Sequence, residues 1–345
     1  METILVTGGC GYIGSHTCVS LLENNYNILI IDSLVNSSKD TLDNIRKTMT
    51  LEGVKISDNI RFLEGDLRDK LWLDNVFSDY IQSKKPIKSV IHFAGLKSIY
   101  ESIISPIDYW DANISTTISL ILTMKKYKCF SLIFSSSASV YAVNGKKLLK
   151  ETDVAKPDTP YGKTKLCIEE ILKDLYFSDT NWRIASLRYF NPIGSHNLGL
   201  LPEDSKGKSA NLFPAILRTI KGNKKRLPIF GNDWPTEDGT CIRDFIHVMD
   251  LAEAHVAALR FLKDNNPQNI SINIGTGKGT SVLEIVKTFQ KVNGIDFLYD
   301  FVERRIGDQP FLVADNKLAL DLLDWFPRRN IEDMCNDSIK KFNLN

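Results

Sequence analysis

The chain has 345 residues, of which 43% are hydrophobic and 25% are charged, and its formal net charge at pH 7 is +1. This is an ordinary globular composition, and the length suits one large domain or two modest ones with a sizeable core. A charge this balanced excludes the general basic field typical of nucleic-acid-binding proteins, so no nucleic-acid partner is expected.

The sequence also shows no pattern typical of a membrane helix, a signal peptide or a metal site. No apolar run approaches the ~20 residues of a membrane-spanning helix, so no membrane partner is expected. The first apolar run, residues 4–6, leads directly into a glycine-rich loop and leaves no room for a cleavable signal, which predicts a cytoplasmic protein. The six cysteines are dispersed without Cys-x-x-Cys pairs, which favours reduced thiols, and no metal site is expected.

Short apolar runs alternate with helical periodicity through the first half of the chain. The runs are typical of strands buried on both faces of a sheet. They cover residues 4–6, 28–31, 61–63, 90–93, 132–134 and 184–187, and the helical stretches cover 12–22, 71–80, 114–127 and 163–175. This alternation predicts an α/β fold with a Rossmann-type, doubly wound parallel sheet.

The rhythm changes after about residue 190. Residues 191–239 are rich in Asn, Gly, Pro and Lys and are expected to be loops that cover a site. A helix at 250–262 is expected to return to the first layer, followed by a strand at 270–274 and a small α/β subdomain at 281–342. We therefore expect a cofactor-binding domain over residues 1–190, joined by 240–275, and a smaller substrate-binding domain over 191–345.

The glycine-rich loop after the first strand has the chemistry of a dinucleotide site. Gly8, Gly11 and Gly14 follow a strand and open a helix, so the backbone can approach a pyrophosphate and the helix N-terminus supplies N–H donors. Asp32 ends the second strand about 20 residues further on, where a carboxylate accepts ribose hydroxyls and repels a ribose phosphate. A glycine-rich turn that binds nothing is the alternative, but strand, loop, helix and acid in register favour NAD.

Two further strand ends fit the same ligand. Asp66 and Leu67 follow the third strand, where they are expected to meet the adenine ring. Phe93, Ala94 and Gly95 follow the fourth strand and place small residues where a ligand passes over the sheet edge.

Further along the chain, Ser137, Tyr161 and Lys165 have the chemistry that alcohol oxidation requires. Tyr161 and Lys165 lie one helical turn apart on one face, so the ammonium, together with a positive nicotinamide, favours the phenolate that takes a hydroxyl proton. Lys165 can also bond the nicotinamide ribose. Ser137 ends the fifth strand and can relay the proton. A Tyr-x-x-x-Lys pair alone is common on exposed helices and a serine run is often only a loop, but their occurrence with the NAD signals favours catalysis.

These motifs resemble those of the extended short-chain dehydrogenases/reductases and, within them, of the UDP-glucose 4-epimerase family. The matching segments are residues 7–17, 92–97, 135–141, 161–165, 188–192, 229–233, 236–240 and 246–250. The first and fourth mark only the superfamily, whereas the others are more specific. The resemblance implies reversible interconversion of UDP-glucose and UDP-galactose through a 4-keto intermediate, tightly bound NAD and a homodimer.

The resemblance also implies roles for individual residues. Ser137, Tyr161 and Lys165 are implied to be catalytic. The residues implied to bind NAD are Gly8, Gly11, Tyr12, Ile13, Gly14, Asp32, Ser33, Leu34, Val35, Asn36, Ser37, Asp66, Leu67, Phe93, Ala94, Gly95, Leu96, Lys97, Asn113, Ser137, Tyr161, Lys165 and Phe190. Those implied to bind the nucleotide sugar are Lys97, Ser137, Tyr161, Asn191, Asn211, Leu212, Pro228, Ile229, Phe230, Arg243, Arg305, Asp308 and Leu312. Arg243 and Arg305 read as isolated cations suited to a diphosphate, with a surface salt bridge as the alternative for each.

Four positions depart from the family pattern: Ala142 replaces Gly, Phe245 replaces Tyr, Ile306 replaces an acid, and Leu312 stands where many members carry Tyr. Because Leu is smaller than Tyr, weak activity on N-acetylhexosamine sugars is expected beside the main one. Sugar specificity stays open at this stage.

Two other functions are alternatives to epimerisation. A nucleotide-sugar dehydratase or decarboxylase of the same superfamily is one, but a dehydratase needs an acid/base pair beside the catalytic Ser, and Ala138-Ser139 offers no carboxylate. A non-catalytic NAD-sensing protein is the other. Such proteins typically lose the Tyr or the Lys, and this chain keeps both.

Overall fold

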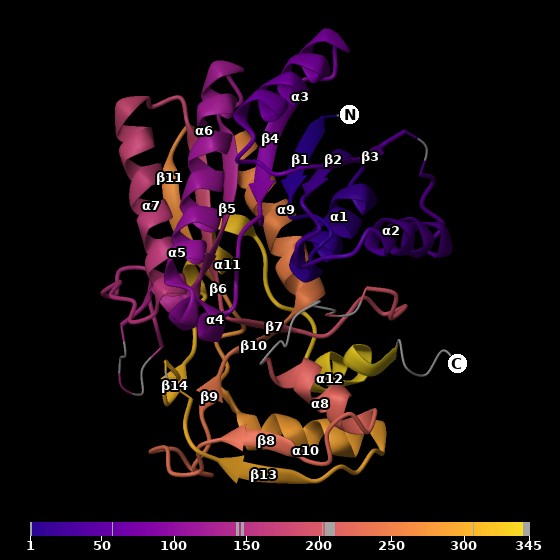
Figure 1. The fold of residues 1–345 in the computed structure, drawn as a ribbon, viewed down its shortest axis with the longest axis vertical. Helices are drawn as coiled ribbons and strands as arrows, with labels where there is room; N and C mark the ends of the chain where they lie inside the picture. The colour runs from indigo at the N-terminus through magenta and orange to yellow at the C-terminus, as the bar shows by residue number, and fades with distance from the viewer. Residues whose placement is uncertain are drawn as a thin grey trace.

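A seven-stranded parallel sheet forms one half of the molecule in the computed structural model (Figure 1). The structure describes residues 2–56, 58–142, 145, 148–201, 203, 211–305 and 307–340. The strands lie in the order β11-β6-β5-β4-β1-β2-β3. Their bounds are β1 Thr3–Thr7, β2 Asn27–Asp32, β3 Ile60–Glu64, β4 Ile87–His92, β5 Ser131–Ser137, β6 Arg183–Tyr189 and β11 Asn269–Ile274. The order reverses between β1 and β4, which is the switch point where such sheets bind ligands.

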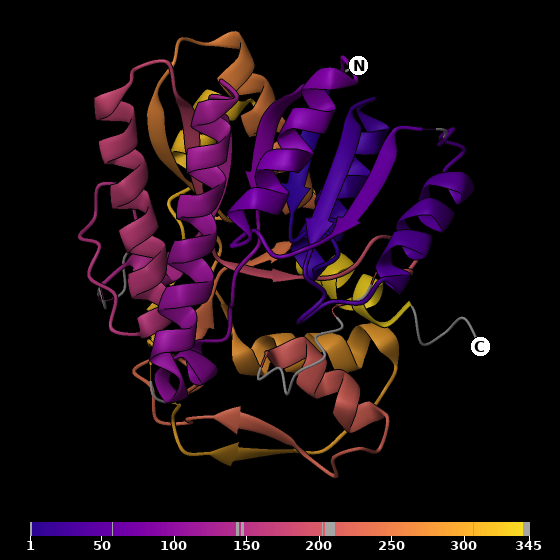
Figure 2. The same ribbon diagram turned by 45° about the horizontal axis from the view of Figure 1, so that its top comes forward.

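Helices cover both faces of this sheet (Figure 2). On one face α1 (Tyr12–Glu23), α2 (Asp40–Leu51) and α9 (Val248–Asp264) share a hydrophobic core with the sheet. On the other face α3 (Lys70–Gln82), α6 (Thr116–Lys126) and α7 (Pro160–Ser178) form a second core. The predicted doubly wound fold is confirmed.

Local details differ from the sequence-based expectation. The segment 61–63 is not buried on both faces, because β3 is the edge strand: Arg61 is exposed and Phe62 and Leu63 are half-buried. The helix expected at 114–127 begins instead with a π-helical turn, Asp111–Ser115, before α6, and two short helices precede it, α4 (Ile99–Ile104) and α5 (Pro106–Trp110).

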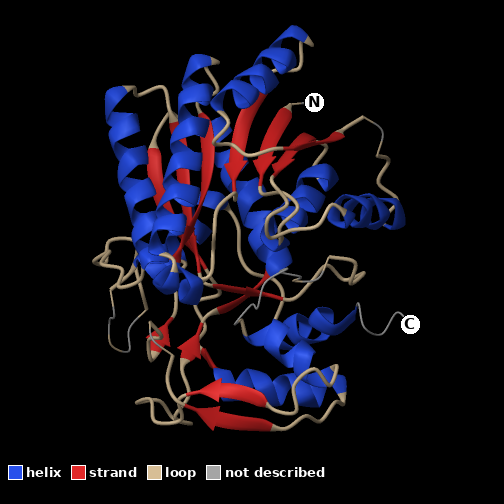
Figure 3. Cartoon of the chain, viewed as in Figure 1, coloured by secondary structure: helices blue, strands red, loops and turns tan. Residues whose placement is uncertain are grey.

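The second half of the molecule holds shorter elements (Figure 3). The expectation that 191–239 is all loop is wrong, because this region contains β7 (Asn191–Ile193), α8 (Leu212–Ile220) and β8 (Leu227–Phe230). Phe213 and Ile216 of α8 are buried in a third core, and this burial stabilises the helix despite its polar flanks. The other elements are β9 (Ile242–Arg243), β10 (Phe245–His247), β12 (Thr280–Ser281), α10 (Val282–Asn293), β13 (Tyr299–Val302), β14 (Phe311–Leu312) and α12 (Ile331–Ile339).

The chain crosses between the two halves more than once. As expected, α9 packs against α1, and β11 joins the sheet beside β6. The expected subdomain at 281–342 is not a single unit, because α11 (Lys317–Leu323) packs on α9 and β11 and buries Ala319 and Leu323 in the first core. The assignment of residues 1–190 to the cofactor and 191–345 to the substrate stays a prediction.

Two further findings concern the whole described chain. Among the described residues, no helix is long and apolar enough to cross a membrane. All six cysteines are free thiols, and only Cys167 is not buried.

Candidate active site

A cavity of about 760 Å³ lies along the carboxyl ends of the sheet strands. Loops that follow β1, β2, β3, β4, β5 and β6 form one wall, and α8, β8, β9, β10 and β14 supply residues of the other. Open parallel sheets bind ligands at this edge, because the strand ends leave a crevice there.

The cavity brings together nearly all the residues predicted from the sequence. Every predicted site residue except Leu34 and Asn113 lines it. Leu34 instead turns the backbone beside Asp32, with φ of +57°. Asn113 is buried behind the wall, where its Oδ1 accepts from the Leu96 N–H at 2.7 Å and its Nδ2 donates to the Leu96 carbonyl at 3.2 Å. Asn113 therefore shapes the cavity through Leu96.

The glycine-rich turn is built for close approach of the backbone. Gly8 has φ of +69°, and a Cβ there would lie 2.8 Å from the Ala94 nitrogen. A Cβ on Gly14 would collide with the Gly8 carbonyl, so α1 can begin this close to β1 only with glycine. Gly11 caps α1 without a side chain, and the first turn of the helix lines the cavity. This geometry fits the pyrophosphate of a dinucleotide.

Asp32 is held in a fixed orientation at the tip of β2. Its Oδ2 accepts from the Cys10 N–H at 2.9 Å. Its Oδ1 accepts from the Leu34 N–H at 2.9 Å and from the Ser37 hydroxyl at 2.8 Å. These three donors keep a carboxylate at the cavity wall, at the end where the sequence predicts the adenosine ribose.

The tip of β3 carries a charged pair. Arg68 lines the cavity beside Asp66 and contacts both Asp66 and Asp111. The hydrogen bond from the Arg68 side chain lowers the pKa of Asp66, although burial opposes this. Sequence reasoning missed Arg68, since one arginine in a loop carries no distinguishing pattern.

Tyr161, Lys165 and Ser137 converge in the middle of the cavity. Thr159 caps α7, and Pro160 occupies its first turn, so Tyr161 stands at the start of the helix. The Lys165 Nζ donates to the Ser135 carbonyl at 2.7 Å and lies 5.8 Å from the centroid of the Tyr161 ring. The Ser137 hydroxyl accepts from the Ser139 N–H at 3.1 Å.

Burial is the main cause of the pKa shifts of Tyr161 and Lys165. It raises the pKa of Tyr161, and the hydrogen bond with Ser137 lowers it by less. Burial also lowers the pKa of Lys165 to about 8, against the opposing charge of Glu169. Desolvation therefore dominates the pKa of Tyr161 in the protein without nucleotide, and the stabilisation of the phenolate by Lys165 together with a positive nicotinamide stays a prediction.

An ion pair between α7 and β6 was not predicted from the sequence. Glu169 lies one turn beyond Lys165 on α7 and accepts from the Arg188 Nε at 3.0 Å. Both side chains are buried, and Ser136 also donates to Glu169. These contacts join α7 to β5 and β6, so they fix the position of Lys165 relative to the carboxyl ends of these strands.

The far end of the cavity holds two guanidinium groups. The Arg243 Nη2 lies 3.2 Å from Asp308 Oδ1, and the Arg305 Nε lies 3.4 Å from Asp308 Oδ2. The interpretation of Arg243 and Arg305 as isolated cations is therefore wrong, because a shared carboxylate joins them. The Arg305 guanidinium also stacks 4.3 Å from the centroid of the Phe230 ring. Two forks fixed this way suit a diphosphate.

One acidic residue near this end was not foreseen. Glu203 lines the cavity, lies 3.6 Å from the Lys97 Nζ and accepts from the Asn211 amide at 2.8 Å. Glu203 lies in the region expected to be loop, where a single Glu has no sequence pattern that would mark it as a site residue.

Two of the four departures from the family pattern line the cavity. Leu312 on β14 is half-buried in the wall, and Phe245 on β10 is buried. Ala142 bonds the Val154 carbonyl through its backbone. Ile306 lies outside the described residues.

Comparison with solved structures shows the same fold in proteins of known activity. The UDP-glucose-4-epimerase of Stenotrophomonas maltophila with bound NAD and formylated UDP-arabinopyranose superimposes with a TM-score of 0.91 at 40% identity, over 99% of this chain and 98% of that one. The UDP-glucose 4-epimerase of Bifidobacterium longum in complex with NAD+ and UDP gives a TM-score of 0.91 at 38% identity, over 100% and 99%.

Sequence comparison gives the same result. The UDP-glucose 4-epimerase of Bacillus subtilis (strain 168) is 44% identical over 335 residues, which cover 97% of this chain and 95% of that protein. The bifunctional UDP-glucose 4-epimerase and UDP-xylose 4-epimerase 1 of Pisum sativum is 43% identical over 97% of this chain and 94% of its own. Residues 4–275 match the pattern of the NAD dependent epimerase/dehydratase family. The chain belongs to the NAD dependent epimerase/dehydratase family.

Proposed function

We propose that this protein is a UDP-glucose 4-epimerase that interconverts UDP-glucose and UDP-galactose. One observation carries the proposal: a single cavity holds the glycine-rich turn, the group of Ser137, Tyr161 and Lys165, and the paired guanidinium groups of Arg243 and Arg305. Relatives named UDP-glucose 4-epimerase that match over nearly the whole chain support it.

NAD is the cofactor that the first half of the cavity suits. The first turn of α1 would hold the pyrophosphate, and the Asp32 carboxylate, fixed by its hydrogen bonds, would accept the adenosine ribose hydroxyls. Lys165 reaches the nicotinamide ribose from α7. NAD bound here would supply a reversible hydride acceptor for C4 of the sugar, so that hydride could return to either face of the 4-keto sugar.

Tyr161 is the base of this reaction. Its phenolate takes the proton of the 4-hydroxyl, Ser137 bridges the two oxygens, and the proton returns to the oxygen at C4 in the reverse step. Because burial raises the pKa of Tyr161, the positive charge of Lys165 alone does not suffice to ionise it. The phenolate of Tyr161 would therefore need further positive charge beside it, which an oxidised nicotinamide ring bound in the cavity would supply.

Anchoring at the far end lets the sugar turn over. Arg243 and Arg305 hold the diphosphate, and the hexose lies against smaller contacts such as Leu312. Binding energy at the UDP end thus retains the 4-keto intermediate while its ring rotates. Leu312 leaves more room than a Tyr, so weaker activity on UDP-N-acetylhexosamines is part of the proposal.

Assembly and compartment form the remaining part of this proposal: a cytoplasmic homodimer. Free, mostly buried thiols fit a reducing compartment. Ile118 and Leu122 of α6 and Phe177 of α7 expose apolar side chains on one side of the sheet, which fits a helical subunit contact. Light scattering of the purified chain is expected to give twice the chain mass of 39.0 kDa.

Activity is tested by incubating the purified protein separately with UDP-galactose and UDP-N-acetylgalactosamine and identifying the sugars by NMR. UDP-glucose is expected from the first, and a slower formation of the N-acetylglucosamine form from the second. The Tyr161→Phe variant is the matched control for a contaminating epimerase. Loss of water to a 4-keto-6-deoxy sugar would instead identify a dehydratase, and binding of NAD without conversion would identify an NAD sensor.

A further inference from the structure

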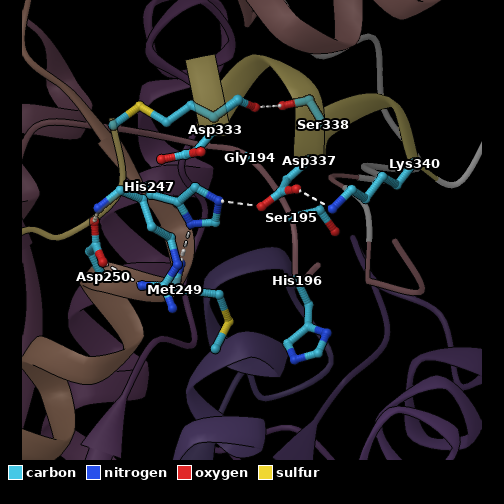
Figure 4. Close-up of polar contacts among 12 residues, drawn as sticks. Gly194, Ser195, His196, His247, Met249, Asp250, Asp333, Asp337, Ser338 and Lys340 are labelled. Carbon is cyan, nitrogen blue, oxygen red and sulfur yellow. Dashed lines mark hydrogen bonds and ion pairs between the residues drawn. The ribbon is translucent and has the colours of Figure 1, made fainter. Parts of the chain in front are cut away.

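A chain of contacts outside the cavity begins at the C-terminal helix. Asp337 on α12 lies 3.3 Å from the Nε2 of His247 (Figure 4). Because the Met249 N–H donates to the His247 Nδ1 at 3.0 Å, the Nε2 carries the hydrogen that bonds Asp337. Lys340 lies 2.6 Å from the other carboxylate oxygen and holds it from the opposite side. The ring of His247 is therefore fixed at both nitrogens.

The fixed imidazole packs on the turn that follows β7. Gly194 in this turn has φ of +93°, and a Cβ at this position would lie 2.8 Å from the His247 Nε2. Both the backbone conformation and the space thus require glycine here. His247 is fully buried, so its ring forms a rigid support for the Gly194 backbone.

The same turn is bonded to the first turns of α1. The Tyr12 hydroxyl donates to the Gly194 carbonyl at 2.7 Å, and burial raises the pKa of Tyr12, so the phenol keeps its hydrogen. The His196 N–H donates to the His16 Nε2 at 3.1 Å, and the His16 Nδ1 in turn donates to the Tyr12 carbonyl at 2.7 Å. Residues 194–196 therefore hold Tyr12 at its side chain and its backbone.

Tyr12 connects this network to the cavity. It follows Gly11, the N-cap of α1, and both residues line the cavity at the glycine-rich turn. The first-turn N–H groups of a helix bind phosphate only when they point at it, so a small shift of Tyr12 moves the donors. We propose that Asp337 and His247 are positioning residues that act through Gly194 and Tyr12 to set the affinity of the turn for the dinucleotide, which rests on the proposed binding of NAD there.

The test measures NAD and UDP binding to the full-length protein by calorimetry. Tyr12→Phe removes only the hydroxyl and is expected to weaken NAD binding about tenfold, the scale of one buried hydrogen bond. Asp337→Ala is expected to weaken it about threefold to tenfold, and Asp337→Asn, which keeps an acceptor for His247, by less than about threefold. UDP affinity is expected to stay within about twofold, because UDP occupies the Arg243 and Arg305 end.

A double variant distinguishes a positioning role from a general destabilisation of the protein. The double variant of Tyr12→Phe and Asp337→Ala is expected to bind NAD within about twofold of the affinity of Tyr12→Phe alone. The reason is that both changes interrupt the same series of contacts from Asp337 to Tyr12. Asp333→Ala is the matched control: it removes the acceptor for the Asn330 N–H in the capping box of the same helix, at 2.9 Å, and is expected to leave NAD affinity unchanged. His247→Asn keeps a cap for α9 and serves as the second variant if Asp337→Ala does not fold.

Several results would overturn the positioning role. One is a loss of NAD affinity in the double variant equal to the product of the two single losses, and another is an equal loss of NAD and UDP affinity. A third is an Asp333→Ala loss as large as that of Asp337→Ala, and a fourth is unchanged NAD affinity in both Asp337→Ala and His247→Asn. A wild-type protein that binds no NAD would refute the proposed function and with it the positioning role, whereas normal NAD binding with insensitive variants would refute only the latter.

Discussion

The buried charge of Lys165 predicts a pH-dependent contribution to the free energy of unfolding. Lys165 is only 5% exposed, and burial lowers its pKa from 10.5 to about 8. The unfolded chain therefore binds this proton more tightly than the folded protein does. At pH values below 8, keeping Lys165 charged in the folded state costs about 3 kcal/mol of the free energy of unfolding.

Replacement by methionine removes this cost. Lys165→Met keeps the length of the side chain and loses the hydrogen bond to the Ser135 carbonyl, whose loss costs about 1–3 kcal/mol. The variant is expected to be more stable than the wild type at pH 7 by roughly 1 kcal/mol, while its turnover falls. Between pH 8 and 10.5 the unfolded wild type holds the proton and the folded one releases it, so wild-type stability rises and passes that of the variant.

Urea unfolding of both nucleotide-free proteins at pH 7, 8, 9 and 9.5 provides the assay. The stability difference between them cancels the other titrating groups, and it is expected to shift by about 2 kcal/mol in favour of the wild type from pH 8 to 9.5. Lys163→Met, on the exposed side of the same helix, is expected to change stability by less than about 0.5 kcal/mol at each pH. A Lys165→Met difference that stays constant from pH 7 to 9.5 would refute the burial argument.

Three further predictions concern the ligands. Tyr161→Phe is expected to keep NAD bound and to lower turnover at least ~100-fold, since it removes the proton acceptor, and near-normal turnover would exclude Tyr161 as the base. The wild type is expected to bind NAD at least ~10-fold more tightly than NADP, because the Asp32 carboxylate repels a ribose phosphate, and equal affinities in a titration would mean that it does not face the ribose. Leu312→Tyr is expected to raise the ratio of kcat/KM for UDP-galactose over UDP-N-acetylgalactosamine by filling the wall, and an unchanged ratio would place Leu312 outside the sugar pocket.

Local pattern was sufficient for much of the fold and the cofactor half of the site. The spacing of Gly8, Gly11 and Gly14 encodes a turn that requires glycine at Gly8 and Gly14, and the four-residue spacing of Tyr161 and Lys165 encodes one helical face. Parallel strands end at the same edge of a sheet, so residues at successive strand ends were expected to meet there. All of these signals are contained in short, contiguous stretches of sequence.

Burial and long-range pairing were decided only by the tertiary structure. Arg243 bonds Asp308 across 65 residues of chain, and His247 bonds Asp337 across 90. No local period encodes such contacts, because they depend on how β9, β10 and α12 pack together. The pKa of Tyr161 depends on tertiary structure for the same reason: the sequence places a lysine one turn away, but the depth of both groups, which sets their desolvation, exists only once the cavity has formed.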